Sequence, residues 1–349
     1  MEEEGREEVS GRTYRVGVVG AGLVGEELVR VLEQRRFPAG EVRVMARSSR
    51  TQDIAGKPRE VIAASAEAFE GLDVALFAGT EGAAGAAALY GWQAAERGIF
   101  VVDNGGDFRM DERVPLIVPE VNAEAMRGHS GFIANPNCST IQMVVALAPL
   151  HRAAGIKRVV VSTYQSVSGT GRPGVRALAA QREAHRRKAA KVDLGPYPHP
   201  IFDNCIPQIG SLKDQMPGYY SEEIKMVLET RKIFGRPDLA LTATCVRVPV
   251  SMGHSEAVNV EFERDLSPEE ARELLRQAPG VSVEDDPGNA LYPLAARSAG
   301  EDAVYVGRIR RDFSRPNSLN FWCVADNIRK GAALNAVQIV EKAIEMSLL

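Results

Sequence analysis

The sequence predicts an α/β protein of two domains: a Rossmann-type first domain and an α+β second domain with a mainly antiparallel sheet. Three observations lead to this prediction. A glycine-rich turn joins a strand to a helix near the N-terminus, strands and helices alternate over residues 14–138, and the later strands follow one another in pairs. A chain of 349 residues is long enough for two domains with separate cores.

The composition is that of an ordinary globular protein, with 45% hydrophobic and 25% charged residues. A net charge of −4 gives no basic footprint, so we expect neither nucleic acid nor a membrane as a partner. No apolar run approaches the ~20 residues that span a bilayer. The N-terminus is acidic, unlike a signal or transit peptide, and we expect residues 1–13 to form a disordered tail.

The cysteines are widely spaced and include no C-x-x-C pair, which argues against a zinc site and against a disulfide framework. We therefore expect no metal and a cytoplasmic location. The four are Cys138, Cys205, Cys245 and Cys323.

A dinucleotide-binding turn is predicted by Gly20-Ala21-Gly22-Leu23-Val24-Gly25, which follows the strand Tyr14–Val19 and precedes the helix Glu26–Gln34. In this pattern the first glycine permits the tight turn, the second lets a pyrophosphate approach the backbone, and the third lets the helix pack on the strand. The anion would lie at the helix N-terminus. A glycine-rich turn that binds nothing is the alternative.

The end of the next strand, Val42–Met45, predicts NADP rather than NAD as the cofactor. A site selective for NAD usually carries Asp or Glu there, to accept a hydrogen bond from the ribose 2′-hydroxyl. Here the sequence continues Ala46-Arg47-Ser48-Ser49-Arg50, and Arg47 with Ser48 suits a 2′-phosphate. Solvated surface arginines are the alternative.

The remaining elements of the first domain predict a parallel, doubly wound sheet. The strands Leu72–Phe77 and Gly98–Asn104 flank an alanine-rich helix. Ligands of such sheets bind at the carboxyl ends of the strands. Arg109 lies just past one such end and Cys138 follows the short strand Gly131–Ala134, so we expect the two side chains to face one crevice.

Cys138 lies where a helix is predicted to begin. Pro136 excludes a regular helix before it, Asn137 is a residue type that caps helices, and the apolar run Ile141–Leu150 continues the helix. A thiol in the first turn of a helix meets the positive end of the helix dipole, which favours the thiolate. The pattern predicts a nucleophile, and a buried cysteine that only fills space is the alternative.

The rest of the chain predicts an α+β domain over residues 139–327 and a C-terminal helix over residues 328–349 that packs on the first domain, residues 14–138. Residues 196–217, rich in Pro and Gly, predict an irregular connection. The expected strands are Ile156–Gln165, Ala240–Pro249, Glu256–Phe262, Val304–Ile309 and Leu319–Val324. The expected helices are Arg172–Lys191, Ser221–Phe234, Ser267–Gln277 and Gly331–Leu349.

Four polar residues of the second domain are candidates for substrate chemistry. His254, in a turn between two strands, suits a general acid or base near neutral pH, with a surface role as the alternative. Arg247 is expected mid-strand among apolar residues, where it would clamp a carboxylate or form a structural salt bridge. Glu222 and Lys225, three apart on a helix, share a face, either as site residues or as an ordinary ion pair.

Seven motifs, in order, make the chain resemble the aspartate-semialdehyde dehydrogenases from about Tyr14 to the C-terminus. The matches around Cys138 and over Thr244–Phe262 are the most specific. The motifs are GAGLVG, DNGGDFRM, NPNCST, YQSVSG, SEEIKM, TCVRVPV and GHSEAVNVEF. On the cofactor side the chain departs from the family pattern at Met45, where serine is usual, and in the loop after Phe77.

The resemblance implies a role for each matching residue. Cys138 would be the nucleophile that forms the acyl-enzyme, His254 the acid/base, and Gln165 the residue that orients the thiohemiacetal. Glu222 and Arg247 would hold the amino-acid end of the substrate, and Asn137 would bind the substrate beside the nucleophile. Arg109 and Lys225 would hold the phosphate. The cofactor contacts would be Gly20, Gly22, Leu23, Val24, Gly25, Arg47, Ser48, Ser168, Gly169 and Asn327.

The resemblance also implies the reaction: NADP-dependent reductive dephosphorylation of β-aspartyl phosphate to aspartate β-semialdehyde, in the pathway to diaminopimelate, lysine, threonine and methionine. The small-molecule partners would be this substrate and inorganic phosphate, and the assembly a homodimer or a dimer of dimers. Two alternatives stay open, a related NADP-dependent thioester reductase such as malonyl-CoA reductase and a non-catalytic NADP-binding paralogue. Glu222 with Arg247 suits an amino acid and argues against the first, and Cys138 with His254 argues against the second.

Overall fold

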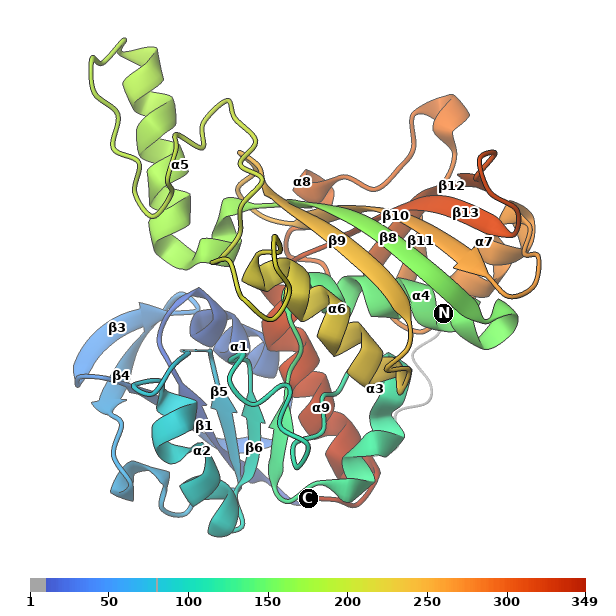
Figure 1. Cartoon of the computed structure of the whole chain (residues 1–349). Coiled ribbons are helices and arrows are strands. Elements are labelled where there is room, and N and C mark those ends of the chain that lie inside the picture. Colours follow the sequence, from blue (N-terminus) through green and yellow to red (C-terminus); the bar gives the residue numbers. More distant parts are fainter. Residues whose placement is uncertain (1–10, 80) are drawn as a thin grey trace. The chain divides into compact units, whose positions relative to one another are not determined.

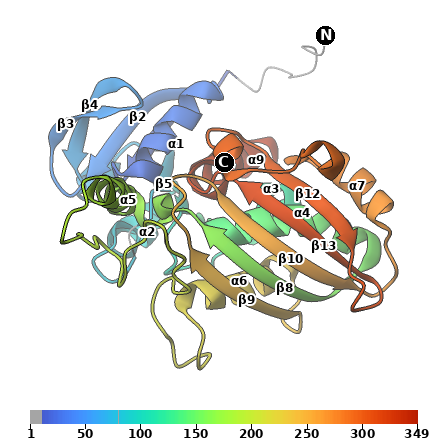
Figure 2. The same ribbon diagram turned by 90° about the horizontal axis from the view of Figure 1, so that it is seen from above.

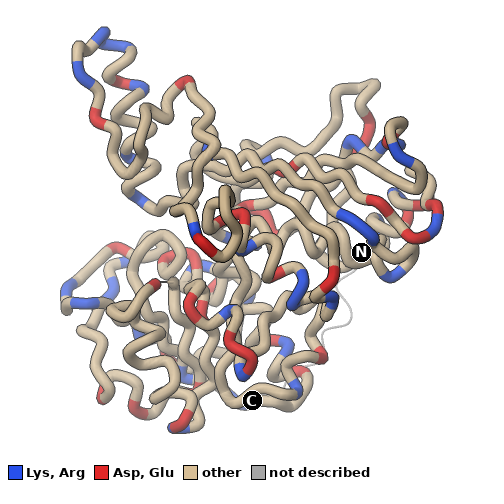
Figure 3. Tube along the Cα trace, viewed as in Figure 1, with Lys and Arg blue, Asp and Glu red and all other residues tan. Residues whose placement is uncertain are grey.

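The computed structural model describes residues 11–79 and 81–349, which form two compact units (Figure 1). The first unit contains the chain through Pro119, then Ala123–Asn135 and Ala336–Leu349, and the second contains Glu120–Asn122 and Pro136–Asn335. The tail expected at residues 1–13 lies, apart from residues 11–13, outside the described residues. Acidic and basic residues are interspersed along both units (Figure 3).

Within the described residues, the first unit is built on a seven-stranded sheet of order β3-β4-β2-β1-β5-β6-β7. Every neighbouring pair except β3–β4 is parallel, which confirms the predicted Rossmann-type α/β fold. The strands are β1 (Tyr14–Val19), β2 (Ala39–Ala46), β3 (Arg50–Ile54), β4 (Lys57–Ala63), β5 (Val74–Phe77), β6 (Phe100–Asp103) and β7 (Phe132–Ala134), and the helices include α1 (Leu23–Gln34), α2 (Ala86–Glu96) and the short α3 (Pro119–Asn122).

The β3–β4 hairpin is an element that the sequence does not predict. Ile54 and Val61 are its fully buried apolar side chains, and charged residues around them hide the strand pattern. The turn places Ala55 at φ 56° and Gly56 at φ 78°, and the N–H of Gly56 donates to Oδ1 of Asp53 (3.1 Å). Two left-handed residues between paired strands fit the primed turns that match strand twist.

The second unit contains, among its described residues, a six-stranded sheet of order β11-β12-β13-β10-β8-β9. Its three central ladders are antiparallel and its two outer ladders are parallel. Helices α4 (Cys138–Ala154), α6 (Ser221–Phe234) and α7 (Pro268–Arg276) pack on the sheet, and Figure 2 looks onto the strands with α4 and α6 behind them. The strands are β8 (Ile156–Gln165), β9 (Ala240–Arg247), β10 (His254–Phe262), β11 (Val281–Val283), β12 (Val304–Arg311) and β13 (Ser318–Ala325).

Helix α5 (Gly171–Arg186) and the chain after it form an arm that stands away from the sheet of its unit (Figures 1 and 2). Buried Gln181 ties the arm together, because its Nε2 donates to the carbonyl of Asp193 (2.9 Å) and its Oε1 accepts the N–H of Ile201 (2.8 Å). The helix ends five residues before the expected Lys191, since Lys188 takes the left-handed φ of 53°. The arm's small apolar core is Val167, Ala177, Leu178, Tyr197, Ile201 and Ile206.

The chain ends in α9 (Leu334–Glu345), which follows a wide π-type turn over Arg329–Ala333. From Ala336 onward the helix belongs to the first unit. There the guanidinium of Arg35 donates to both carboxylate oxygens of Glu341, at 2.8 and 2.6 Å. In the part of the chain that the structure describes, every helix is too short or too polar to cross a bilayer.

Candidate active site

Cys138 is the first residue of α4, as the sequence predicts. Asn137 precedes it in extended conformation, and its Oδ1 accepts the N–H groups of Ser139 (3.0 Å) and Thr140 (3.3 Å). This is the geometry of an N-cap, which leaves the half-buried thiol in the first helical turn. The positive end of the helix dipole there favours a thiolate.

The other cysteines differ from Cys138 in their surroundings. Cys245 on β9 and Cys323 on β13 are buried, and burial raises the pKa of both thiols well above the usual range. Cys205 is exposed in the irregular connection, and none of the four forms a disulfide. Of the four, Cys138 is the cysteine that combines partial exposure with a helix N-terminus.

Two carboxylates of α6 anchor Asn137, the residue before Cys138. The backbone N–H of Asn137 donates to Oε2 of Glu229 (2.7 Å), and its Nδ2 donates to Oε1 of Glu222 (2.9 Å). Nζ of Lys225 lies 4.0 Å from Oε2 of Glu222, so the expected shared face of this helix is present. Glu229 is not among the residues predicted from sequence, although its spacing of seven from Glu222 puts both on one helix face.

Gly331, in the wide turn before α9, packs directly on Cys138. A Cβ at this position would lie 2.7 Å from Cβ and 3.2 Å from Cα of Cys138. The first distance is shorter than any that real Cβ atoms show, so only glycine fits without a shift. The sequence gives no local signal for this contact, because the two residues lie far apart in the chain.

Gln165 and Arg247 are neighbours at the ends of the parallel strands β8 and β9. Both are buried, and Nη1 of Arg247 donates to the carbonyl of Ser166 (2.6 Å). Arg247 is the last residue of β9 rather than a mid-strand residue, because the ladder ends there. Nε2 of Gln165 donates to Oγ1 of Thr163 (3.3 Å).

His254 is the first residue of β10 and fully buried, so the expected position in a turn is wrong. Gly253 makes the turn with φ 84°, and the strand begins immediately after it. The N–H of Ser166 donates to Nδ1 of His254 (3.1 Å), so the neutral ring carries its proton on Nε2. Burial and the charge of Arg247 lower the pKa of His254 well below 6.5, which keeps the ring neutral. Its Nε2 has no hydrogen-bond partner among the described residues.

Asn327 joins the strand ends around His254. Its Oδ1 accepts hydrogen bonds from the hydroxyls of Ser166 and Ser168 (both 3.0 Å) and from the N–H of Gly253 (3.1 Å). Its Nδ2 is buried without a partner in the described part of the chain. A buried amide N–H normally has an acceptor, so this group suits a carbonyl oxygen of a ligand.

Gln142 and Gly169 connect the residues around Cys138 with the residues around His254 and Arg247. Gln142 lies one turn after Cys138 on α4, and its Nε2 donates to the carbonyl of His254 (3.4 Å). A Cβ at Gly169 would lie 2.8 Å from Nη1 of Arg247 and 3.2 Å from Nε2 of His254. The second unit thus brings its candidate residues together around the start of α4 and the ends of β8, β9 and β10.

Arg109 belongs to the first unit, so the structure does not relate it to Lys225 or Cys138. Its guanidinium is buried and donates to the carbonyls of Asn135 (2.9 Å) and Asn104 (2.7 Å). Burial raises the pKa of nearby Asp103 to about 6. The hydrogen bond from the N–H of Gly105 and the charge of Arg109 lower this pKa, but burial has the larger effect.

The glycine turn of the first unit fits a dinucleotide. Gly20 has φ 121°, and a Cβ at Gly25 would lie 1.7 Å from the carbonyl oxygen of Gly20, so both positions require glycine. Around the Cβ position of Gly22, the N-cap of α1, no heavy atom lies within 4 Å, which leaves room for a phosphate. Arg47 and Ser48 are exposed beyond the end of β2, and Leu23 and Val24 open the helix.

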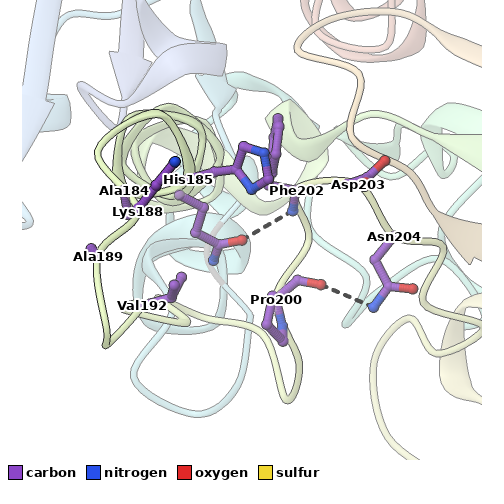
Figure 4. Close-up of a pocket in the computed structure, with 10 residues that line it drawn as sticks. Ala184, His185, Lys188, Ala189, Val192, Pro200, Phe202, Asp203 and Asn204 are labelled. Carbon is purple, nitrogen blue, oxygen red and sulfur yellow. Dashed lines mark hydrogen bonds between the residues drawn. The ribbon is translucent and has the colours of Figure 1, made fainter.

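A cavity of about 520 Å³ lies elsewhere, between α5 and the chain that follows it (Figure 4). His185, Lys188, Phe202 and Asn204 are among its lining residues, and none of the candidate site residues is. The described residues also contain no group of three or more His, Cys, Asp or Glu side chains arranged to hold a metal ion.

Two family models match the chain. The model described as semialdehyde dehydrogenase, NAD binding domain, covers residues 15–129, and the model described as semialdehyde dehydrogenase, dimerisation domain, covers residues 147–330.

Curated relatives match over nearly the whole chain. The aspartate-semialdehyde dehydrogenase of Bacillus subtilis (strain 168) is 45% identical over 352 residues, which cover 97% of this chain and 100% of the relative. The aspartate-semialdehyde dehydrogenase of Aquifex aeolicus (strain VF5) is 47% identical over 346 residues, which cover 96% of this chain and 99% of the relative.

Solved structures are similar as well. Aspartate-semialdehyde dehydrogenase II of Vibrio cholerae, complexed with ASA, has a TM-score of 0.90 at 42% identity and covers 96% of this chain and 99% of that chain. The Candida albicans aspartate-semialdehyde dehydrogenase with NADP, at a TM-score of 0.74 and 24% identity over 97% and 100% of the two chains, is similar in fold.

Proposed function

The chain belongs to the aspartate-semialdehyde dehydrogenase family, and on this premise we propose that it converts β-aspartyl phosphate to aspartate β-semialdehyde through a thioester on Cys138, with NADP as cofactor. As a member of this family it is an oxidoreductase that acts on an aldehyde group. The observation that carries the mechanism is the link through Gln142 between the helix that bears Cys138 and the strand that begins at His254.

In the first step the thiolate of Cys138 attacks the acyl carbon of β-aspartyl phosphate. A carbon–sulfur bond forms, the bond from carbon to the phosphate oxygen breaks, and inorganic phosphate leaves. Arg109 and Lys225 hold this anion, since cations bind phosphate with charge-assisted hydrogen bonds. Asn137 keeps the helix start in place through Glu222 and Glu229.

His254 acts on the oxygen of the reacting carbon. NADPH, when bound, supplies the hydride that reduces the thioester. The neutral imidazole, with its proton on Nε2, donates to the oxygen as negative charge develops, and takes the proton back as the thiohemiacetal collapses to the aldehyde and the Cys138 thiolate. Gln165, next to Arg247 in the strand register, orients the same intermediate.

The amino-acid end of the substrate is held by opposite charges. Arg247 binds its carboxylate and Glu222 its ammonium, and both side chains are buried, which strengthens such contacts. This pair favours an amino-acid substrate over the malonyl thioester of a related reductase. The pathway is the one from aspartate to lysine, threonine and methionine.

NADP is held by residues of each unit. In the first unit the open space at Gly22, the turn from Gly20 to Gly25, and Arg47 with Ser48 support the binding of a pyrophosphate and a 2′-phosphate. In the second unit the unpartnered Nδ2 of Asn327, beside Ser168 and Gly169, supports an acceptor from the nicotinamide carboxamide.

The reaction is tested with aspartate β-semialdehyde, NADP and inorganic phosphate. We expect NADPH formation that depends on phosphate and disappears in Cys138→Ala, whereas Cys205→Ala, at an exposed cysteine, keeps it. Activity with malonyl-CoA instead would favour the related reductase, and no activity with either would favour a non-catalytic paralogue. Retained activity in Cys138→Ala would overturn the nucleophile.

We also propose that the enzyme is a cytoplasmic homodimer or dimer of dimers, joined by the face of the six-stranded sheet opposite α4. Cys323 faces α4, where its Sγ donates to the carbonyl of Gln142, so the adjacent Trp322 points to the other face. There its ring lies 5.3 Å from that of Tyr164, which is 39% exposed. Such an aromatic pair suits the centre of an interface.

Light scattering after size exclusion tests the assembly. We expect Trp322→Arg to give monomers, because a charge would be buried in the interface. Phe313→Arg, at a side chain 99% exposed in the β12–β13 turn, is the control and should keep the native mass. A native mass in Trp322→Arg would locate the interface elsewhere.

A further inference from the structure

Arg50, the first residue of β3, is exposed but fixed in position. Its Nε and Nη2 donate to Oε1 of Gln52 (3.0 and 2.8 Å), and its Nη1 donates to the carbonyl of Ser48 (3.0 Å). These bonds use three of the five N–H groups of a guanidinium and leave one on each terminal nitrogen. Two such N–H groups form the fork that binds two oxygens of a phosphate.

Gln52 connects this guanidinium to the glycine turn. Its Nε2 donates to the carbonyl of Ala21 (2.9 Å), between Gly20 and Gly22. One amide side chain therefore binds the dinucleotide turn with its N–H and Arg50 with its oxygen. The carboxylate of Glu33, near the same hairpin, is already paired with Lys57 and Arg59, and Arg50 forms no ion pair with any described carboxylate.

We propose that Arg50, positioned by Gln52, binds the 2′-phosphate of NADP and sets the preference of this enzyme for NADP over NAD. In Rossmann-type domains the ribose 2′ position lies near the end of the second strand, close to the glycine turn. Ser48 follows β2 and Ala21 belongs to the turn, so Arg50 is tied to the first place directly and to the second through Gln52. A guanidinium that is already ordered loses less conformational entropy when it binds. The proposal rests on the NADP-dependent function given above.

Fluorescence titration of the enzyme without substrate tests this role. We expect Arg50→Ala to weaken NADPH binding about tenfold or more, as the loss of charge-assisted hydrogen bonds does, with NADH binding unchanged. Gln52→Leu should weaken NADPH binding less and in the same direction. Adenosine 2′,5′-bisphosphate should lose affinity for Arg50→Ala, while AMP should not. Lys57→Ala, which removes a cation from the same hairpin, is the control and should bind NADPH normally.

Three outcomes would overturn the proposal. If Arg47→Ala weakens NADPH binding and Arg50→Ala does not, Arg50 has no role, and the proposed NADP-dependent function stands. If Arg50→Ala weakens NADPH and NADH equally, its role is not recognition of the 2′-phosphate. If the native enzyme binds NADH as tightly as NADPH, the cofactor assignment fails together with this inference.

Discussion

Glu256 lies two residues after His254 on β10, with Thr163 and Cys323 opposite it on the neighbouring strands. It is fully buried, and burial raises the pKa of its carboxyl well above 4.5, while the side chain of Gln142 offsets part of this rise. The folded protein therefore keeps a proton that the unfolded chain releases above pH 4.5. Burial thus favours the protonated form of this carboxyl on the strand that begins at His254, and this makes stability depend on pH.

We expect the free energy of unfolding to fall as pH rises from about 4.5 toward the raised pKa of Glu256, by up to about 1.4 kcal/mol per pH unit. Glu256→Gln removes this slope, because its amide has the shape of the neutral acid without its proton. Urea unfolding at pH 5, 6, 7 and 8 measures the slope in the native protein and in Glu256→Gln. Glu261→Gln, on the same strand, is the control: Arg315 and Lys157 lower the pKa of Glu261, so this variant should lose stability at neutral pH. An unchanged slope in Glu256→Gln would contradict the assignment.

At the residue scale, local signals in the sequence predict the residues whose roles depend on their neighbours in the chain. The N-cap at Asn137 and the glycines at 20 and 25 are of this kind. Local signals do not predict the burial of His254, because this burial depends on the pairing of β10 with β8 and β13. Glu229 is likewise not predicted, because it accepts its hydrogen bond from the N–H of Asn137, which lies 92 residues away in the sequence.

At the scale of elements, the wide turn over Arg329–Ala333 brings Gly331 into contact with Cys138. Hydrophobic periodicity predicts a plain helix from Gly331, because it does not distinguish the wider turn from an α-helix. The β3–β4 hairpin is unpredicted for a related reason, since an edge hairpin with charged side chains lacks an apolar alternation. One of these elements packs on Cys138, and the other contains Arg50, for which a role in NADP binding is proposed above.

Gly331→Ala tests the turn. The added Cβ would meet Cys138 at 2.7 Å, so we expect the helix start to move and kcat to fall about tenfold or more, with a smaller change in KM. Steady-state kinetics with aspartate β-semialdehyde measure this. Gly288→Ala, whose Cβ would meet its nearest atom at 3.5 Å, is the control and should keep native kcat. Native kcat in Gly331→Ala would show that the contact does not position the nucleophile.

At the scale of the whole molecule, the first unit is completed by the last residues of the chain. Arg35, the residue after α1, pairs with Glu341 on α9, and the two side chains are 20% and 30% exposed. Composition and periodicity predict the two-domain fold, and the strand order of each sheet follows from long-range pairing that no local pattern encodes.

Glu341→Gln tests whether the Arg35–Glu341 pair stabilises the packing of α9 in the first unit. Loss of a partly exposed bidentate ion pair should lower the free energy of unfolding by about 1 kcal/mol at low salt, and by less in 1 M NaCl because salt screens the charges. Thermal unfolding at the two salt concentrations measures the difference. Glu345→Gln, in the exposed pair with Lys342 on the same helix, should change little. Equal effects of the two variants would show that this packing does not depend on the Arg35–Glu341 pair.

The division of the first unit between both ends of the chain has a consequence for synthesis. Domains generally fold in order as they leave the ribosome. Here the sheet of the first unit is made early, whereas residues 336–349 emerge only after the entire second unit. The domain with the earliest strands is therefore finished last. A premature stop codon just after Asn335 would leave the second unit whole and the nucleotide-binding fold open.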